Sequence, residues 1–459
     1  MSNTINFEKL AKYSQPGPRY TSYPTANEFH NTFNETTLRE SFYRADTIYY
    51  DKPLSLYTHL PFCKSACYFC GCNVIYTNNQ SKKERYIHYL QKELHILQNA
   101  MNTEKKVVQF HFGGGTPTFF NAQQLDEIIK MIRQTFPNFA NDCEISCEID
   151  PRHFNEEQMI VLKQNGFNRV SFGVQDFDSK VQKSINRIQS QELVQECVSM
   201  ARKHGIESIN FDLIYGLPNQ SLESFHKTLE NVLNLSPDRL AIFSYAHVPW
   251  VKATMQKIDE KQLPNPLQKL QILKNTIEFL TDNGYEMIGM DHFAKPNDEL
   301  CVAQRNGELR RNFQGYTTKG FSQTIGMGLT SIGEGVDYYT QNFKDIQSYE
   351  HALENGILPV ALGIVLSKED ILRKEIIMNL MNTSMLDFNA ISKTFNIDFN
   401  TYFKNELENL KPMQDLGLLE LYQGSLKITP TGSMLIRNIA MVFDSYLHKN
   451  QTKRFSKTI

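Results

Sequence analysis

The sequence lacks three features that would point to a membrane or a nucleic acid. No apolar run approaches the ~18 residues that span a bilayer. The N-terminal MSNTINFEKLAKYSQPGPRY has no basic region followed by an apolar stretch, so we expect no signal peptide. The 48 Lys and Arg residues nearly balance the 50 Asp and Glu residues, and a net charge of -2 favours no nucleic-acid partner. We therefore expect a cytoplasmic protein without membrane segments.

Cysteine is scarce and unevenly placed. The 459-residue chain has eight cysteines, and four of them lie in PFCKSACYFCGCN, at residues 61–73. In a reducing cytoplasm such a cluster indicates metal or redox chemistry rather than disulfides. A tetrahedral zinc site usually draws on two separated pairs, and no suitable second pair follows. Four buried structural cysteines in one loop would be improbable. The third interpretation is an iron–sulfur cluster. A [4Fe–4S] cluster takes four ligands, so three cysteine ligands would leave one iron open for a small molecule.

Strand-like and helix-like segments alternate after residue 54. Predicted strands are 55–60, 107–112, 144–149, 169–174, 208–216, 239–245 and 285–290. Predicted helices between or after them are 83–98, 122–134, 156–164, 192–204, 222–233 and 267–281. This alternation predicts βα units on a parallel sheet, either doubly wound or closed into a full or partial barrel.

Polar or glycine-rich residues follow many of the predicted strands. The cysteine loop follows the first strand and GGGTPT (113–118) the second, while Glu148, Asp150, Gln175 and Asp212 lie at or near later strand ends. Parallel α/β sheets bind ligands at the edge where their strands end. We therefore expect one large shared site at that edge.

The spacing Cys63-x3-Cys67-x2-Cys70 directly after a first strand resembles the signature of radical S-adenosylmethionine (SAM) enzymes. Further stretches resemble one branch, the oxygen-independent coproporphyrinogen III oxidases, over nearly the whole chain. These stretches are PGPRYTSYPTANEF, FGGGTPTF, CEIDPR, VSFGVQDFD, NFDLIYGLP, FSYAHVPW, RRNFQGYTT and IGMGLTSIGE. Related heme-binding chaperones usually have Asp and Phe where this chain has Gly71 and Cys72, and usually lack the PGPRYTSYPT stretch.

The resemblance implies an α/β fold, an incomplete TIM-like βα barrel of the radical SAM type. It further implies an N-terminal extension over the active site (1–50), the partial barrel itself (51–365) and a mainly helical, winged-helix-like C-terminal domain (366–459). The winged segment is not strongly basic, so we do not expect it to bind DNA.

The resemblance also implies roles for individual residues. Cys63, Cys67 and Cys70 would ligate a [4Fe–4S] cluster, and Cys72 would not. The cluster-bound SAM would contact Tyr57, Phe69, Gly114, Glu148 and Ile332. A second SAM would contact Gly115, Thr116, Gln175, Arg187, Asp212 and Ala246. Phe313 and Gln314 would lie near the reactive centre.

The implied reaction is oxidative decarboxylation of two propionates of coproporphyrinogen III to vinyls, in heme biosynthesis. Partners would be this substrate and a low-potential electron donor such as flavodoxin or ferredoxin, and we expect a monomer. The substrate has four carboxylates, so Arg19, Arg310 and Arg311 are candidates to bind them. The alternatives are a heme carrier, which would bind heme without cleaving SAM, and a zinc-stabilised regulator, which would contain zinc and no iron.

Overall fold

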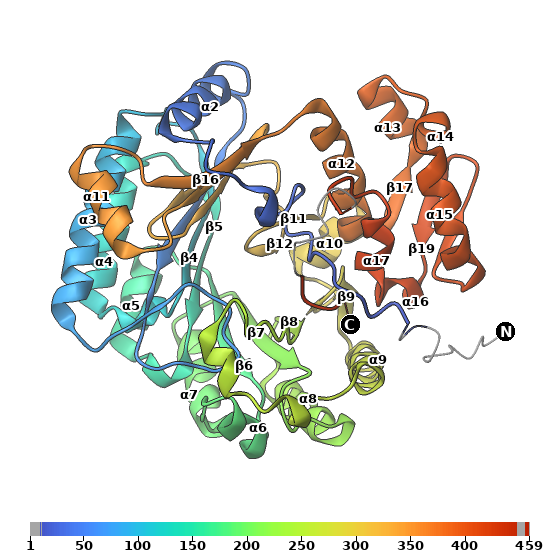
Figure 1. Ribbon diagram of the computed structural model, residues 1–459. Helices are drawn as coiled ribbons and strands as arrows, with labels where there is room; N and C mark the ends of the chain where they lie inside the picture. The colour runs from blue at the N-terminus through green and yellow to red at the C-terminus, as the bar shows by residue number, and fades with distance from the viewer. Residues whose placement is uncertain (1–9, 11, 448–454, 459) are drawn as a thin grey trace.

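A computed structural model describes residue 10 and residues 12–447 and 455–458 of the chain. Its centre is an open, 12-stranded sheet (Figure 1). In pairing order the strands are β16 (Val360–Val365), β15 (Tyr338–Asn342), β14 (Ile332–Glu334), β13 (Gln323–Met327), β1 (Leu54–Leu60), β4 (Val107–Gly114), β5 (Phe139–Ile149), β6 (Arg169–Gln175), β7 (Ser208–Tyr215), β8 (Arg239–Ser244), β10 (His292–Ala294) and β9 (Glu286–Ile288). Strands β13, β1 and β4 to β8 are parallel neighbours. The two end strands do not pair with each other in the described sheet, so the predicted incomplete barrel is confirmed.

Six of the seven predicted strands occur as parallel strands of this sheet. The seventh, predicted at 285–290, was wrong as a βα strand: β9 is a three-residue strand that pairs antiparallel with β10. Only residues 289–291 connect β9 to β10, and Gly289 adopts φ 59° in that turn. Such a short connection can only join antiparallel strands, because a parallel pair needs a crossover of a dozen or more residues.

Helices pack along the outside of the parallel strands (Figure 1). They are α3 (Gln80–Gln98), α4 (Ala122–Thr135), α5 (Glu156–Gln164), α6 (Ser179–Ser184), α7 (Gln191–Lys203), α8 (Leu222–Leu235) and α9 (Pro266–Asp282). Capping boxes begin four of them, at Asn121, Asn155, Ser221 and Asn265. Each supplies acceptors for backbone amides that the first helical turn leaves unpaired. All six predicted helices are present, with ends that differ by at most three residues.

The largest hydrophobic core lies between the sheet and these helices. Phe110 and Phe112 of β4 meet edge to face at 4.9 Å, and Phe167 packs against both rings. Gln109 and His111, which alternate with these residues along β4, line a cavity inside the barrel. The helix layer therefore makes the parallel strands rigid and leaves their inner face and their carboxyl ends for a ligand site.

The chain before β1 and the chain after β8 add smaller elements. Before the barrel lie η1 (Ala26–Glu28) and α2 (Glu35–Thr47), and β2 (Phe62–Cys63) pairs with β3 (Ile75–Tyr76) in the cysteine loop. Short 3-10 helices occur at Pro117–Phe119 (η2), Pro151–His153 (η3), Ala253–Lys257 (η4) and Glu260–Gln262 (η5). After β10 come α10 (Glu299–Arg305), the hairpin β11 (Arg310–Asn312) and β12 (Gly315–Thr317), and α11 (Ile346–Glu354).

The C-terminal part is mainly helical and has its own core (Figure 1). It consists of α12 (Lys368–Thr383), β17 (Met385–Asp387), α13 (Phe388–Phe395), α14 (Phe399–Tyr402), α15 (Lys404–Asp415), β18 (Leu419–Leu421), β19 (Ser425–Ile428), α16 (Pro430–Ser433) and α17 (Ile436–Met441). Strands β18 and β19 form a hairpin that turns at Gln423-Gly424. Leu10, Tyr20 and Tyr23 of the N-terminal segment belong to this second core. The outermost parts of the segments 1–50 and 366–459 lie outside the described residues.

No helix among the described residues combines the length and the apolar character that crossing a bilayer requires.

Candidate active site

Two adjoining cavities open inside the barrel, at and below the edge where the parallel strands end. Their volumes are about 400 and 320 Å³, and they share the residues Cys72, His111, Gly114, Glu148, Asn312 and Gln314. The first cavity is lined by the predicted residues Cys63, Cys67, Phe69, Cys70, Gly114, Gly115, Thr116, Glu148, Gln175, Arg187, Asp212 and Gln314. The second adds Tyr57, Phe313 and Ile332. Ala246, in the loop after β8, does not line either cavity.

The cysteine loop lies against the glycine-rich turn that follows β4. Gly115 N donates to the Leu60 carbonyl at 2.9 Å, and Thr116 N donates to the Phe62 carbonyl at 3.0 Å. A Cβ on Gly115 would lie 2.8 Å from the carbonyl oxygens of Pro61 and Phe62. Glycine is required here because the two backbones approach too closely for a side chain. The Cys63 Sγ lies 3.4 Å from the Thr116 hydroxyl, across the same contact.

Two arginines surround the Cys67 thiol. Arg152 Nη2 lies 3.6 Å and Arg187 Nη1 lies 3.7 Å from its Sγ. Asp150 accepts from both guanidinium groups, at 2.7 and 3.1 Å. Burial alone would raise the pKa of Asp150, but Arg187 and Arg152 lower it to about 2. The site therefore places two fixed positive charges beside a sulfur that becomes negative when it binds metal.

The sequence prediction missed Arg152, and it placed Asp150 at a strand end of the shared site without giving it an individual role. Asp150 could have indicated the position of Arg152, because it ends a predicted strand and is followed by Pro151 and Arg152 in CEIDPR. The short helix η3 begins at Pro151 and brings Arg152 back onto the Asp150 carboxylate, whose side chain also caps that helix. Arg187 comes from the turn after α6, 35 residues beyond Arg152, and only the fold shows that the two converge.

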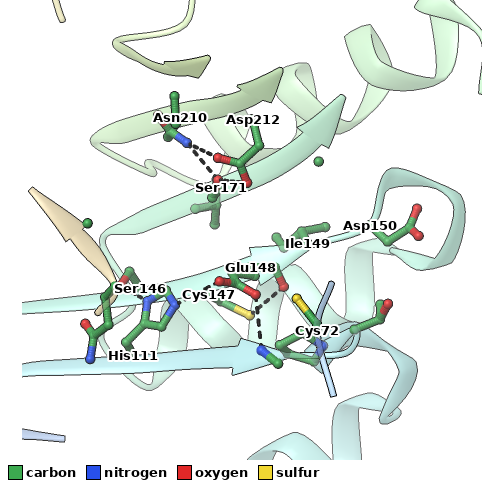
Figure 2. Close-up of a pocket in the computed structure, with 18 of the residues that line it drawn as sticks. Cys72, His111, Ser146, Cys147, Glu148, Ile149, Asp150, Ser171, Asn210 and Asp212 are labelled. Carbon is green, nitrogen blue, oxygen red and sulfur yellow. Dashed lines mark hydrogen bonds and ion pairs between the residues drawn. The ribbon is translucent and has the colours of Figure 1, made fainter. Parts of the chain in front are cut away.

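Glu148 stands at the end of β5, facing β4. Its Oε2 accepts from Gly114 N at 3.2 Å, and its Oε1 lies 3.5 Å from His111 Nε2 (Figure 2). His111 Nδ1 lies 2.6 Å from the Ser146 hydroxyl, and its ring stacks on Tyr57 with centroids 5.9 Å apart. Glu148 is held in place while its side chain stays 44% exposed to the cavity. A ligand hydroxyl could therefore still reach this carboxylate.

His59 holds the Tyr57 side chain through a hydrogen bond. Its Nε2 donates to the Asn73 carbonyl at 3.0 Å, so its Nδ1 accepts the Tyr57 hydroxyl at 3.1 Å. Burial lowers the pKa of His59 to about 4, so the ring is neutral near pH 7.

Asp212 lies on β7, two strands away from Glu148. It accepts from the Ser171 hydroxyl and from the Asn210 amide, both at 2.9 Å (Figure 2). Burial, together with the negative charge of Glu148, raises the pKa of Asp212 to about 6. Gln175, which ends β6, has a φ of 67°, unusual for a residue other than glycine. Both side chains line the first cavity.

The donor set fits an iron–sulfur cluster with one open iron. Cys63, Cys67 and Cys70 line the first cavity without converging on a point: no three His, Cys, Asp or Glu side chains within the described ranges are placed to hold a single ion. A cluster with bridging sulfides spaces its thiolate ligands more widely than one ion does. Cys63, Cys67 and Cys70 would hold such a cluster, and its open iron would supply a binding position for a small ligand in the cavity that Gly114 and Glu148 also line.

Comparison with known proteins agrees with this geometry. The radical SAM superfamily matches residues 57–232, and the HemN C-terminal domain matches residues 366–435. The fold and the three-cysteine loop thus define a radical SAM protein.

Similar proteins of known name identify the family within the radical SAM class. An oxygen-independent coproporphyrinogen III oxidase of Helicobacter pylori is 61% identical over 99% of this chain and 100% of the relative. The Escherichia coli protein of the same name is 44% identical over 98% of this chain and 97% of its own length. The solved structure described as "Coproporphyrinogen III oxidase (HemN) from Escherichia coli is a Radical SAM enzyme" matches with a TM-score of 0.90 and 43% identity, covering 97% of this chain and 100% of that one. The chain belongs to the oxygen-independent coproporphyrinogen III oxidase family.

Proposed function

We propose that the protein converts two propionate side chains of coproporphyrinogen III to vinyl groups, giving protoporphyrinogen IX for heme biosynthesis. Each propionate gives a β-hydrogen atom to the 5′-deoxyadenosyl radical and then loses CO₂ and one electron, which an external one-electron acceptor takes up. The main structural support is the placement of three cluster-type thiols in the same cavity as Glu148 and Asp212.

Cys63, Cys67 and Cys70 would hold the [4Fe–4S] cluster. Bound cluster and SAM supply a 5′-deoxyadenosyl radical able to remove the propionate β-hydrogen. The chain's own contribution is to bind these groups, orient them and keep water and oxygen away.

The first SAM site would be formed by Tyr57, Phe69, Gly114, Glu148 and Ile332. Gly114 adopts φ 120°, and a Cβ there would lie 2.9 Å from the His59 ring, so the backbone is held close to the barrel wall. Glu148 can accept from ribose hydroxyls while Gly114 N and His111 hold its other side.

The second SAM site would be formed by Gly115, Thr116, Gln175, Arg187, Asp212 and Ala246. Arg187 is tied to Asp150 and to the Gly173 carbonyl, and its buried Nε has no hydrogen-bond partner in the described residues. That donor suits a carboxylate, since buried polar groups are normally satisfied. Ala246 would make its contact through the loop after β8, outside the cavity lining.

Phe313 and Gln314 would flank the reacting propionate. Phe313 meets the Tyr339 ring edge to face at 6.0 Å, which fixes its orientation. Gln314 lines both cavities, and its buried Nε2 lacks a partner among the described side chains and backbone. An amide donor left in this state is poised to bind a ligand oxygen. A low-potential donor such as flavodoxin or ferredoxin would supply electrons to a monomeric enzyme.

The test is an anaerobic assay of reconstituted protein with SAM, a reductant and coproporphyrinogen III. Expected products are protoporphyrinogen IX and 5′-deoxyadenosine, with both products lost in Cys63→Ala along with the ~400 nm absorbance of thiolate-bound iron. Cleavage of SAM without CO₂ loss from the substrate would contradict the proposal. Stoichiometric heme binding with no SAM cleavage would instead identify a heme carrier.

A further inference from the structure

A group of cations lies where the N-terminal segment, the barrel and the C-terminal helices meet. We call Arg19, Lys269, Arg311 and Arg437 the cationic cluster. Arg19 follows the PGP turn, Lys269 is on α9, Arg311 is on β11 and Arg437 is on α17. Figure 1 shows α9, β8, β9 and α17 around this junction. None of these four side chains lines the two cavities already described.

Arg437 holds the backbone that positions Arg19 in the cationic cluster. It is buried, and its guanidinium donates to the carbonyls of Gly17 and Pro18 and to two carbonyls of residues 457 and 458. This clamp fixes the backbone immediately before Arg19. The Arg19 guanidinium can then reach the Ser244 carbonyl at the carboxyl end of β8.

Among the described residues, the four positive charges of the cationic cluster exceed the negative charge beside them. Of the described carboxylates, Asp291 interacts with the cationic cluster, 3.5 Å from Arg311 Nη2, and it is shared with His292 at 2.7 Å. The Arg311 side chain is only 4% exposed, yet its Nε and Nη1 have no hydrogen-bond partner in the described structure. Lys269 Nζ donates to the Tyr245 carbonyl at 3.4 Å and lies over the Tyr215 ring, with no acid paired to it in the described residues.

Burial, reinforced by repulsion within the cationic cluster, disfavours the charged form of two of its members. Burial and the charges of Arg19, Arg437 and Lys457 lower the pKa of Lys269 to about 7, and burial with Arg19 lowers the pKa of Arg437 to about 9. Cations buried without matching anions cost free energy. Such an arrangement is typical of a site that receives an anion from outside.

The cationic cluster lies next to the edge of the sheet where the proposed reaction site is located. Arg19 contacts the end of β8, and Tyr215 ends β7. Strand β8 follows β4 by four positions in the sheet, on the order of 19 Å at ~4.8 Å per strand before curvature shortens it. A tetrapyrrole with extended side chains can bridge the barrel mouth over such a span. His292 and Tyr316, which line the first cavity, connect the two regions through Asp291 and Arg311.

We propose that the cationic cluster binds the two propionates of the substrate that the reaction leaves intact. Arg19 and Lys269, both partly exposed, are the contact residues. Arg311 is buried beside Asp291 and adds positive charge near Arg19. This inference rests on the proposed function. The inference assigns a carboxylate site to one end of the tetrapyrrole, while the reacting propionate at the other end lies beside Phe313 and Gln314.

The test measures binding rather than turnover alone. Coproporphyrin III, the stable oxidised form with all four carboxylates, is titrated by fluorescence into reconstituted enzyme containing SAM but no reductant. Its tetramethyl ester serves as the ligand control. Lys269→Met and Arg19→Gln should each weaken coproporphyrin III binding about tenfold or more, the usual effect of losing a charge-assisted hydrogen bond. Ester binding should be equal in all proteins. Lys274→Met, on the same helix but paired with Glu278 at the surface, is the matched control and should bind like wild type.

Lys269→Met keeps the Arg437 clamp on the N-terminal segment, so its effect does not depend on that segment's fold. Unchanged coproporphyrin III affinity in Lys269→Met would overturn the inference, even if Arg19→Gln were impaired. The assay for protoporphyrinogen IX distinguishes a failure of the carboxylate-site inference from a failure of the proposed function. Wild type that makes product while Lys269→Met keeps full affinity refutes the carboxylate site alone. Wild type that makes no product refutes the proposed function.

Discussion

Gly115→Ala should impair assembly of the iron–sulfur cluster. A Cβ at this position would lie 2.8 Å from the carbonyl oxygens of Pro61 and Phe62, where ordinary contact begins at 3.4 Å. The backbone before Cys63 must therefore retreat by about 0.6 Å, the difference between these distances. The hydrogen bonds from Gly115 N and Thr116 N, at 2.9 and 3.0 Å, resist that movement.

The expected cost is about 1–3 kcal/mol, from weakening two hydrogen bonds of ~0.5–1.5 kcal/mol each. Displacement of Cys63 should lower iron and sulfide per protein after anaerobic reconstitution, and the ~400 nm absorbance with them. Chemical denaturation of the apo-protein measures the stability cost separately.

Gly71→Ala is the matched control because it lies in the same cysteine loop with nothing within 4 Å of its Cβ position. It should keep normal iron content and stability. Equal iron content and equal unfolding midpoints for the two variants would refute the steric reasoning. Neither readout depends on SAM, so a loss of SAM contacts at Gly115 cannot imitate the result.

Three further predictions concern charge and ligation. The pKa of Asp212, raised to about 6 by burial and by Glu148, means that folding opposes its ionisation, so this residue destabilises the protein progressively as pH rises from about 3.8 through 6. The rise from 3.8 to about 6, at ~1.36 kcal/mol per pH unit, predicts that Asp212→Asn gains about 3 kcal/mol of unfolding free energy at pH 8 and roughly half of that at pH 5, while SAM binding weakens. A pH-independent difference in denaturation curves would contradict this. Arg152→Met should shift the reduction potential of the cluster to more negative values in an EPR-monitored titration, because Cys67 Sγ loses a cationic donor, and an unchanged potential would exclude that role. Cys72→Ser should keep full iron content and absorbance, whereas a loss of iron would make Cys72 a ligand.

Local pattern in the sequence was enough for the βα architecture and for most of the candidate site. Hydrophobic periodicity placed six parallel strands and six helices, because each such segment carries its own buried face. Strand order along the chain then placed the cysteine loop, Gly114, Glu148 and Asp212 at one sheet edge, since parallel strands end together. Hydrophobic periodicity could not predict the direction of β9, because a short strand has the same residue pattern whether it pairs parallel or antiparallel.

By itself the sequence determined the three-cysteine loop, the glycine-rich turn and the polar strand ends, because these features depend on short spacings within single segments. Only the tertiary structure decided that Arg152 and Arg187 meet at Cys67, and that Gly115 touches the backbone before Cys63. It alone assembled the cationic cluster, from residues as far apart as 19 and 437. The physical reason is that periodicity shows which face of a segment is buried, whereas the contacts between distant side chains depend on how whole elements pack against one another.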